Sequence, residues 1–469
     1  MADTIIDNIT AHRSPAELFS TLASYPYVFF LDSSLRNRNL GRFSFLGCDP
    51  FLVFKSKGDS ILLDWADGRK ESFKADPFAA LRDIFKRYSR EETDKRLPFT
   101  SGGVGYFSYD MKDFTERLPD IAARDLDLPD CVMGFYDTVI ICDHLRNKTY
   151  IASSGLPCGG SRGKSRRSDR LKRMKERIEK SGDDASSSAS QRGKRAAAPR
   201  SNISRSAYIG AVEKAKRYIK KGDIYQVNLS QRFEAGLSMD PAQLYLKLRS
   251  VSPAPFASYL GFGDLAILSS SPERFLLKKG RHIETRPIKG TRPRGRTPES
   301  DRALERELKK SAKDNAEHIM IVDLERNDLG RVCDYGSVKL SGPPAIEKYA
   351  NVFHMVSTVS GILKKGTGPI DCLLAAFPGG SITGAPKVRS MEIIEELEPV
   401  KRSIYTGAVG YISFSGDMDT SIVIRTLLAK GKKAYFSVGG GIVADSDPEA
   451  EYQETLDKAA GIIHALDNK

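Results

Sequence analysis

The sequence lacks any long hydrophobic run. No apolar stretch approaches the ~18 residues that a membrane-spanning helix requires, so we expect no contact with a membrane. The first residues carry acids early and no apolar segment, and they predict no secretory signal. The six cysteines form no C-x-x-C pair, which excludes a disulfide framework and a zinc site. These absences favour the cytoplasm, where thiols stay reduced.

Charge of one sign is in excess, but only locally. The net charge is +13 over 469 residues, which raises the question of a nucleic-acid partner. From Cys158 to Ser206, however, fifteen lysine and arginine residues stand against five acidic ones. Most of the excess therefore belongs to one segment, and we expect no nucleic-acid partner for the rest of the chain.

This basic segment, residues 156–204, reads as an insert between two larger regions. Its glycine, serine, arginine and lysine content predicts a dispensable, solvated surface loop, with a charged helix over 164–180. We expect disorder at 183–190 and 192–200. A contact of the insert with RNA or an acidic partner remains the alternative.

The regions on either side have different patterns. Residues 1–155 alternate short apolar runs with turn residues, which predicts mostly sheet. Residues 205–469 mix helices and strands and contain no internal repeat. We expect helices at 207–221 and 242–249, and a hairpin over 275–284 that turns at Gly280.

Lys289 is the strongest chemical candidate. It lies in what we expect to be a loop, between Pro287 and Pro293, and arginines surround it in the sequence. Nearby like charges lower the pKa of an amine, and a neutral amine is a nucleophile. On position alone, a solvated loop lysine is the alternative.

Two helices carry acidic residues at spacings that suit a metal. Asp314 and Glu317 open one predicted helix, where they have capping-box spacing. Glu451, Glu454 and Lys458 share a face of the C-terminal helix, which Asp447 and Pro448 begin. The carboxylates are either ligands of Mg²⁺ or ordinary caps and surface ion pairs.

Glycine-rich segments suggest anion binding. Gly439 to Gly441 follow a predicted strand, where backbone N–H groups can approach a carboxylate closely. The run 379–387 is not a Walker A loop, and we expect a turn that leads into a helix at Pro386. Arg425 lies in an apolar strand-like run, which predicts that it pairs with a buried acid or a substrate carboxylate.

These segments together resemble the chorismate-utilising enzymes. The similarity rests on residues 222–230 and 271–275, the Lys289 segment, the Glu317 helix, and, toward the C-terminus, 380–387, 405–410 and 439–454. It covers the chain from about residue 205 onward, and more loosely 41–47 and 102–110. The resemblance implies a large α/β sandwich of two orthogonal antiparallel sheets flanked by helices.

Within that family, two positions separate the reactions. Aminodeoxychorismate synthases have lysine where this chain has Lys289, and anthranilate synthases have alanine. Isochorismate and salicylate synthases use a lysine base where this chain has Gln226. The resemblance therefore implies amination of chorismate to 4-amino-4-deoxychorismate, with anthranilate synthesis or a non-catalytic, tryptophan-sensing scaffold as alternatives.

The resemblance also implies the roles of the site residues and the partners. Mg²⁺ is the expected cofactor, and a separate glutamine amidotransferase subunit the expected ammonia source. Tryptophan is a possible ligand near Leu31 to Ser34, where the usual family pattern is altered. The expected catalytic residues are Lys289, Glu273 and His354, the metal ligands Glu317, Glu454, Asp314 and Glu451, and the substrate-binding residues Gln226, Thr291, Thr383, Tyr405, Arg425, Gly439, Gly440 and Lys458.

Overall fold

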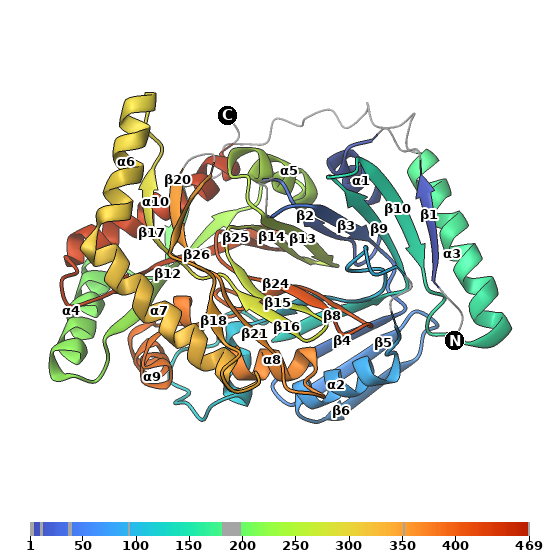
Figure 1. The fold of residues 1–469 in the computed structure, drawn as a ribbon, viewed down its shortest axis with the longest axis horizontal. Coiled ribbons are helices and arrows are strands. Elements are labelled where there is room, and N and C mark those ends of the chain that lie inside the picture. The colour runs from blue at the N-terminus through green and yellow to red at the C-terminus, as the bar shows by residue number, and fades with distance from the viewer. Residues whose placement is uncertain are drawn as a thin grey trace.

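A computed structural model of the chain describes residues 4–9, 13–35, 40–91, 94–180, 198–349 and 352–467. Two large antiparallel sheets lie face to face, with helices on their outer sides (Figure 1). This arrangement confirms the α/β sandwich that the family resemblance implied. No helix in the described ranges is long and apolar enough to cross a membrane.

The first sheet forms the upper layer in Figure 1 and ends at the candidate site. Its neighbouring strands are antiparallel throughout. In spatial order they are β1 (Ile5–Ile9), β10 (Lys148–Ser153), β9 (Thr138–Asp143), β3 (Phe43–Gly47), β2 (Phe29–Asp32), β13 (Phe256–Phe262), β14 (Leu265–Ser271), β25 (Thr426–Lys430), β26 (Lys433–Ile442), β12 (Gln226–Gly236) and β11 (Arg200–Ser201), with β22 (Gly384–Ala385) beside β12.

The second sheet is also antiparallel, and a small third sheet stands apart from it. The second consists of β18 (Lys339–Leu340), β21 (Val359–Ile362), β16 (His282–Thr285), β15 (Arg274–Lys279), β24 (Met418–Ile422), β23 (Ala408–Ser413), β7 (Gly102–Phe107), β8 (Cys131–Tyr136), β4 (Leu52–Lys57), β5 (Ser60–Trp65) and β6 (Lys70–Lys74). The third consists of β17 (Ile288–Pro293), β20 (Val352–Val356) and β19 (Ala345–Lys348).

Capping residues set where most helices begin. The Asp240 and Asp447 side chains accept hydrogen bonds from the first-turn N–H groups of their helices, each followed by proline. The helices expected near 207–221 and 242–249 and the hairpin at Gly280 are confirmed. The helices are α1 (Pro15–Leu22), α2 (Pro77–Arg87), α3 (Gly160–Lys180), α4 (Arg205–Lys221), α5 (Pro241–Val251), α6 (Pro298–Lys310), α7 (Ala312–Gly330), α8 (Pro369–Ala376), α9 (Lys387–Leu397) and α10 (Pro448–Leu466), with the 3₁₀ helices η1 (Tyr109–Phe114) and η2 (Gly380–Ile382).

Apolar side chains fill the space between the sheets and both outer layers. Tyr106 and Ile267 are buried in the cluster between the sheets. A second cluster joins α1, α5 and α10 to the first sheet, and a third joins α2, α7 and α8 to the second. Strands such as β7, β8 and β14 are buried at every position, because both faces of each sheet are covered.

Strands from both ends of the chain are interleaved in each sheet. β2 pairs with β13, and β7 pairs with β23, so that Gly102 lies opposite Ser413. The hairpin β23–β24 lies between β7 and β15, and the hairpin β25–β26 lies between β14 and β12. The sequence regions 1–155 and 205–469 therefore do not form separate sheets.

The basic insert is not the solvated loop that its composition suggested. The expected helix is present as α3, and it packs along β10 at the right of Figure 1. Arg166 and Arg170 both donate to the fully buried Asp137, at 2.8 and 3.1 Å, and Met174 lies in the core. Lys175 and Arg177 also form ion pairs with the N-terminal region, whereas the other face of the helix stays exposed. The segments expected to be disordered lie, apart from residues 198–200, outside the described residues.

Candidate functional site

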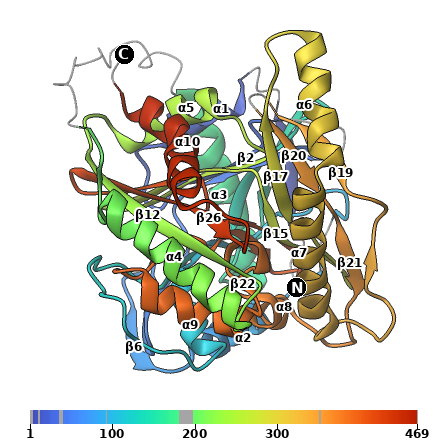
Figure 2. The same cartoon turned by 90° about the vertical axis from the view of Figure 1, so that its left-hand side faces the viewer.

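The candidate site lies at one end of the sandwich. There β12, β22 and β26 are surrounded by α4, α7, α9 and α10, and β17 comes in from the third sheet (Figure 2). The resemblance-derived residues lie on these elements or on the turns next to them. Sequence-distant segments thus meet at the end of the first sheet.

Lys289 lies on β17 and not in a loop as expected. The strand register shifts between Lys289 and Thr291, where Gly290 has a φ of 73°. A bulge of this kind re-aims a side chain. Lys289 Nζ donates to the carbonyl of Ser381 at 3.3 Å. A Cβ added at Gly441 would lie 3.4 Å from Nζ, so the amine reaches across to β26.

The pKa of Lys289 is lowered, as the sequence predicted, but for another reason. Burial lowers the pKa first, Glu317 and other carboxylates act in the opposite direction, and Lys458 adds to the lowering. The neighbouring arginines are not the cause, because each pairs with a carboxylate. Their partners are Glu347 for Arg286, Glu307 and Asp314 for Arg292, and Asp301 for Arg294.

Glu273 is close to Lys289, and both residues contact Ser381. Burial raises the pKa of its carboxyl to about 7, although a hydrogen bond from Ser381 and the charge of Lys289 act against the rise. The Ser381 hydroxyl donates to Glu273 Oε1 at 2.6 Å. A buried carboxyl that titrates near neutrality suits a general acid.

Amide side chains of β12 face the site without protein partners. Both polar side-chain atoms of Gln226 and the Oδ1 atom of Asn228 are buried. None of the three has a hydrogen-bond partner among the described residues. Such atoms normally mark a place for a ligand or water. Gln226 is among the site residues predicted from the sequence, whereas Asn228 and Ser381 are not. Asn228 could have been noticed as a polar residue two positions along the same strand face.

The acidic residues of α7 and α10 divide into two groups. Asp314 and Glu451 already have partners: Arg292 donates to Asp314 at 2.9 Å, and Ser446 donates to Glu451 at 2.6 Å. Asp314 also does not begin the helix, because Ser311 is the N-cap of α7. Glu317 lies 4.0 Å from Lys313 and feels the charge of Lys289 as well, whereas Glu454 pairs with Lys458 at 2.7 Å.

Glu317 and Glu454 suit a divalent cation better than the other two acids. Burial raises the pKa of Glu317, and the charge of Glu454 adds to the rise. Burial acts against ionisation of Glu454 too, but Lys458 outweighs it and holds the pKa below its usual value. Two carboxylates whose charges act on each other form a donor set that fits Mg²⁺. No group of three or more metal-ligating side chains occurs in the described ranges.

Gly439 and Gly440 lie inside β26 and not in a turn after it. β12 covers one side of these residues, while the pairing with β25 ends at Tyr435. A Cβ at Gly440 would be 3.0 Å from Glu451 Oε2, so the missing side chain lets α10 approach. Lys458 donates to the Gly439 carbonyl at 2.8 Å.

Arg425 lies between β24 and β25 and not within a strand, with a φ of 51°. No carboxylate in the described part of the chain forms an ion pair with it, and burial lowers its pKa. His354 is nearby: burial first, and then the charge of Arg425, lower its pKa to about 3. His354 Nδ1 is 2.9 Å from the Thr291 hydroxyl, and its Nε2 lacks a partner among described atoms. An uncompensated arginine beside a neutral histidine suits a carboxylate ligand.

Thr383 and Tyr405 complete the set. The Thr383 hydroxyl donates to the carbonyls of Gly379 and Gly380, at 3.0 and 3.3 Å. Tyr405 is buried, and burial raises the pKa of its phenol. The turn expected to lead into a helix at Pro386 is present, and Pro386 is the N-cap of α9. The contributions of these residues to ligand binding stay predictions.

Relatives of this chain include proteins with two different names. It is 41% identical to aminodeoxychorismate synthase component 1 of Escherichia coli, over 96% of this chain and 95% of the relative. It is 39% identical to anthranilate synthase component 1 of Acetivibrio thermocellus, over 97% and 93% of the two chains.

A solved structure is similar over nearly the whole length. Anthranilate synthase component I of Streptococcus pneumoniae superposes with a TM-score of 0.77, at 31% identity, over 92% of this chain and 93% of the other. The profile of the chorismate binding enzymes matches residues 45–464. The fold, the site and these comparisons agree that the chain belongs to the chorismate binding enzyme family.

Proposed function

We propose that the protein is an aminodeoxychorismate synthase component I, which converts chorismate and ammonia to 4-amino-4-deoxychorismate for 4-aminobenzoate and folate synthesis. The observation that carries this proposal is the position of Lys289. Its amine has a lowered pKa, projects from a bulged strand and reaches Gly441 and the Ser381 carbonyl. Relatives with this name are 40% and 41% identical.

The chemistry requires one nucleophile and one acid. Lys289 Nζ, as the free amine, bonds to C2 of chorismate while the ring double bond shifts and the C4–O bond breaks. Glu273 gives its proton to the departing hydroxyl, which leaves as water. Ammonia then adds at C4, the double bond shifts back and the bond to Lys289 breaks, which returns the amine.

The remaining residues hold the substrate. Arg425, with His354 and Thr291 beside it, receives one carboxylate, and Gln226 supplies neutral hydrogen-bonding groups with no base for water addition. Gly439, Gly440, Thr383, Tyr405 and Lys458 frame the same space. Glu317 and Glu454 would hold Mg²⁺, with Asp314 and Glu451 behind them. When bound, the metal neutralises charge on the ring carboxylate.

Ammonia has to be supplied from outside this chain. The sequence contains no cysteine in a Gly-rich nucleophile motif, and the relatives carry the designation component 1. We therefore propose a separate glutamine amidotransferase subunit as partner. The cytoplasm is the proposed compartment, since all six cysteines are free thiols.

Anthranilate synthase component I is the second candidate. Relatives with that name are as similar as the first group, at 39% identity in Acetivibrio thermocellus and Thermus thermophilus. Both reactions need chorismate, Mg²⁺ and ammonia, but only the second releases pyruvate. The lysine at position 289 favours the first candidate.

Incubation with chorismate, Mg²⁺ and ammonium sulfate, followed by chromatography, tests the assignment. We expect aminodeoxychorismate and no pyruvate. Anthranilate as the main product would transfer the assignment to the second candidate. Absence of any turnover would favour a non-catalytic scaffold.

Tryptophan binding is a separate part of the proposal. A cavity of about 180 Å³ between the sheets is lined by Asp32, Ser33, Phe256 and Tyr411. Asp32 is already engaged by Arg249 at 2.7 Å, and the Ser33 hydroxyl donates to the Phe43 carbonyl at 2.6 Å, so other groups of the lining have to hold the ligand. Calorimetry with tryptophan tests this site, and no heat of binding at millimolar tryptophan would remove it.

A further inference from the structure

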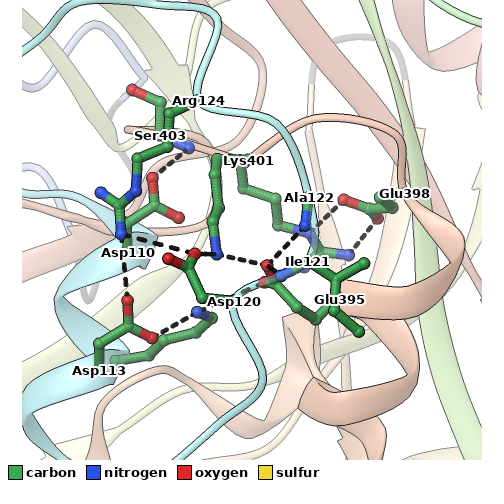
Figure 3. Close-up of polar contacts among 12 residues, drawn as sticks. Asp110, Asp113, Asp120, Ile121, Ala122, Arg124, Glu395, Glu398, Lys401 and Ser403 are labelled. Carbon is green, nitrogen blue, oxygen red and sulfur yellow. Dashed lines mark hydrogen bonds and ion pairs between the residues drawn. The ribbon is translucent and has the colours of Figure 1, made fainter.

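The turn after α9 contains two consecutive buried cations, Lys401 and Arg402, that face opposite ways. Lys401 pairs with Glu395 and Asp120, toward a surface segment of the N-terminal region (Figure 3). Arg402 pairs with Glu398, toward the candidate site. Both side chains are almost fully buried. One short turn thus offers a cation that contacts the site and an adjacent cation that does not.

Arg402 has a partner for each of its five N–H groups. Nε and one Nη2 hydrogen go to Glu398, at 2.9 and 2.7 Å. The other groups go to the carbonyl of Asn228 at 2.8 Å, the carbonyl of Ile382 at 2.9 Å and the hydroxyl of Thr406 at 3.4 Å. The guanidinium therefore bonds to three segments of the chain at once, two of them through backbone carbonyls.

Each of these segments carries a candidate ligand-binding residue next to the bonded atom. Asn228 belongs to β12, two residues after Gln226. Ile382 lies between Thr383 and Ser381, whose hydroxyl holds Glu273. Thr406 follows Tyr405, and Arg402 lies 5.8 Å from the centre of the Tyr405 ring. Glu398 Oε1 adds a link to β12, because it accepts from both the N–H and the hydroxyl of Ser230 at 2.9 Å.

A buried ion pair is poor evidence for stability, because taking two charges out of water offsets most of their attraction. Its better-documented use is to fix one arrangement among several. A planar guanidinium does this well, since its donors have fixed directions, whereas a lysine amine cannot reproduce them. The Arg402–Glu398 pair has this geometry at the meeting point of three chain segments.

We propose that Arg402, oriented by Glu398, is a positioning residue that sets β12, the 381–383 turn and the 405–406 turn in the arrangement that binds chorismate. It touches no substrate itself and acts through the backbone atoms it holds. The inference rests on the proposed function only in that chorismate is the ligand. It does not depend on which product forms.

The test compares Arg402→Lys with Lys401→Met as matched control. Both changes disturb a buried ion pair in the same turn, but only the first removes bonds to the site. We expect Arg402→Lys to raise the KM for chorismate about 10–100-fold with an unchanged KM for ammonia, because small misplacement of positioning groups costs up to about 100-fold. Lys401→Met should leave both constants within about twofold, because surface-directed changes leave site geometry intact, whatever its effect on the melting temperature.

Chorismate consumption and calorimetric binding of chorismate are both measured, so that the answer is independent of the product. A chorismate KM in Arg402→Lys within twofold of wild type, or a rise equal to that of Lys401→Met, would overturn the proposal. Wild-type protein that neither binds nor consumes chorismate would instead refute the proposed function.

If near-ultraviolet circular dichroism shows that Arg402→Lys is not folded, two milder variants test the proposal. Thr406→Val and Ser230→Ala each remove one hydrogen bond to the pair and keep both charges. Both should raise the chorismate KM, and combined they should raise it by less than the product of the single effects, because they act through one pair. A KM in the double variant equal to the product of the two single effects, or no change in KM, would contradict the positioning role of Arg402.

Discussion

At the scale of single residues, the position of Lys289 determines which reaction is expected. Lys289→Ala should lower aminodeoxychorismate formation on the order of 10²-fold or more, because it removes the nucleophile. Lys289→Arg should fail as well, since a guanidinium stays protonated. Both rates are measured by product chromatography.

A covalent adduct gives independent evidence on the same residue. Wild-type protein with chorismate and no ammonia should gain mass, and digestion should place the gain on the peptide that contains Lys289. An adduct on another peptide, or full activity of Lys289→Ala, would reduce the lysine to an electrostatic role.

Glu273 predicts the pH dependence. Its pKa is about 7, and a general acid acts only when protonated, so the rate should fall as the pH rises through neutrality. Ser381→Ala removes a hydrogen bond that favours the carboxylate. In this variant the fall in rate should occur at higher pH, because the pKa of Glu273 rises further.

Glu273→Gln is the companion variant. It should lose about 10²–10⁴-fold in rate and lose the limb near pH 7. The initial rate is measured between pH 5.5 and 9. A limb unchanged in both variants would assign the titration to another group.

The residues predicted from the sequence are those with a recognisable chemical motif. The role of the residues that were missed depends on the folded arrangement. Lys289 and Glu273 were recognisable from their neighbours in sequence. The cause of the lowered pKa of Lys289 was not, because the arginines beside it turn to carboxylates that only the fold brings near. Asn228 and Ser381 lie within segments that carry the family resemblance, but their roles depend on which side of a strand or turn faces the candidate site.

At the scale of elements, α7 and α10 bring Glu317 and Glu454 close enough for their charges to interact. Glu317→Gln and Glu454→Gln should each abolish turnover at limiting Mg²⁺ and leave the melting temperature nearly unchanged, because each removes one anionic oxygen ligand at constant volume. Glu449→Gln, an exposed residue of the first turn of α10, is the matched control.

The measurements are the Mg²⁺ dependence of the rate and calorimetric Mg²⁺ binding in the presence of chorismate. Wild-type affinity in either active-site variant would show that its carboxylate is not a ligand. Reduced affinity in Glu449→Gln would mean that long-range charge, and not coordination, controls binding.

α3 makes a different prediction from the one its composition suggests. Met174→Ala should lower the free energy of unfolding by about 2–5 kcal/mol, because a buried methionine is removed from the core. Lys172→Ala, on an exposed position of the same helix, should change it by less than about 0.5 kcal/mol. Denaturant titration measures both. Equal effects would mean that α3 is only loosely attached.

The sequence predicted where helices and hairpins occur better than it predicted what they pack against. Caps and turn residues marked α5, α10 and the β15–β16 hairpin. The charge pattern of α3 concealed its attachment, because its buried partner Asp137 lies in a turn outside the insert. β17 was expected as a loop, since prolines at 287 and 293 flank it. An edge of a small sheet tolerates that placement.

At the scale of the whole molecule, the family resemblance gave the sandwich, whereas periodicity alone gave only mixed helices and strands. Strand patterns do not specify partners that lie far away in sequence. The pairing of β7 with β23 and of β2 with β13 follows from the final arrangement of both sheets. No local signal in residues 102–107 indicates residues 408–413.

The central positions of the two late hairpins have a consequence for how this protein is made. Residues 408–442 are synthesised after the strands on both sides of them, yet they join the two parts of each sheet. Until they emerge, β7, β15, β14 and β12 each present an open strand edge, the kind of surface that promotes aggregation. A nascent or truncated chain should therefore depend on chaperones, and any product ending before residue 408 should be a substrate for proteolysis rather than a partly active enzyme.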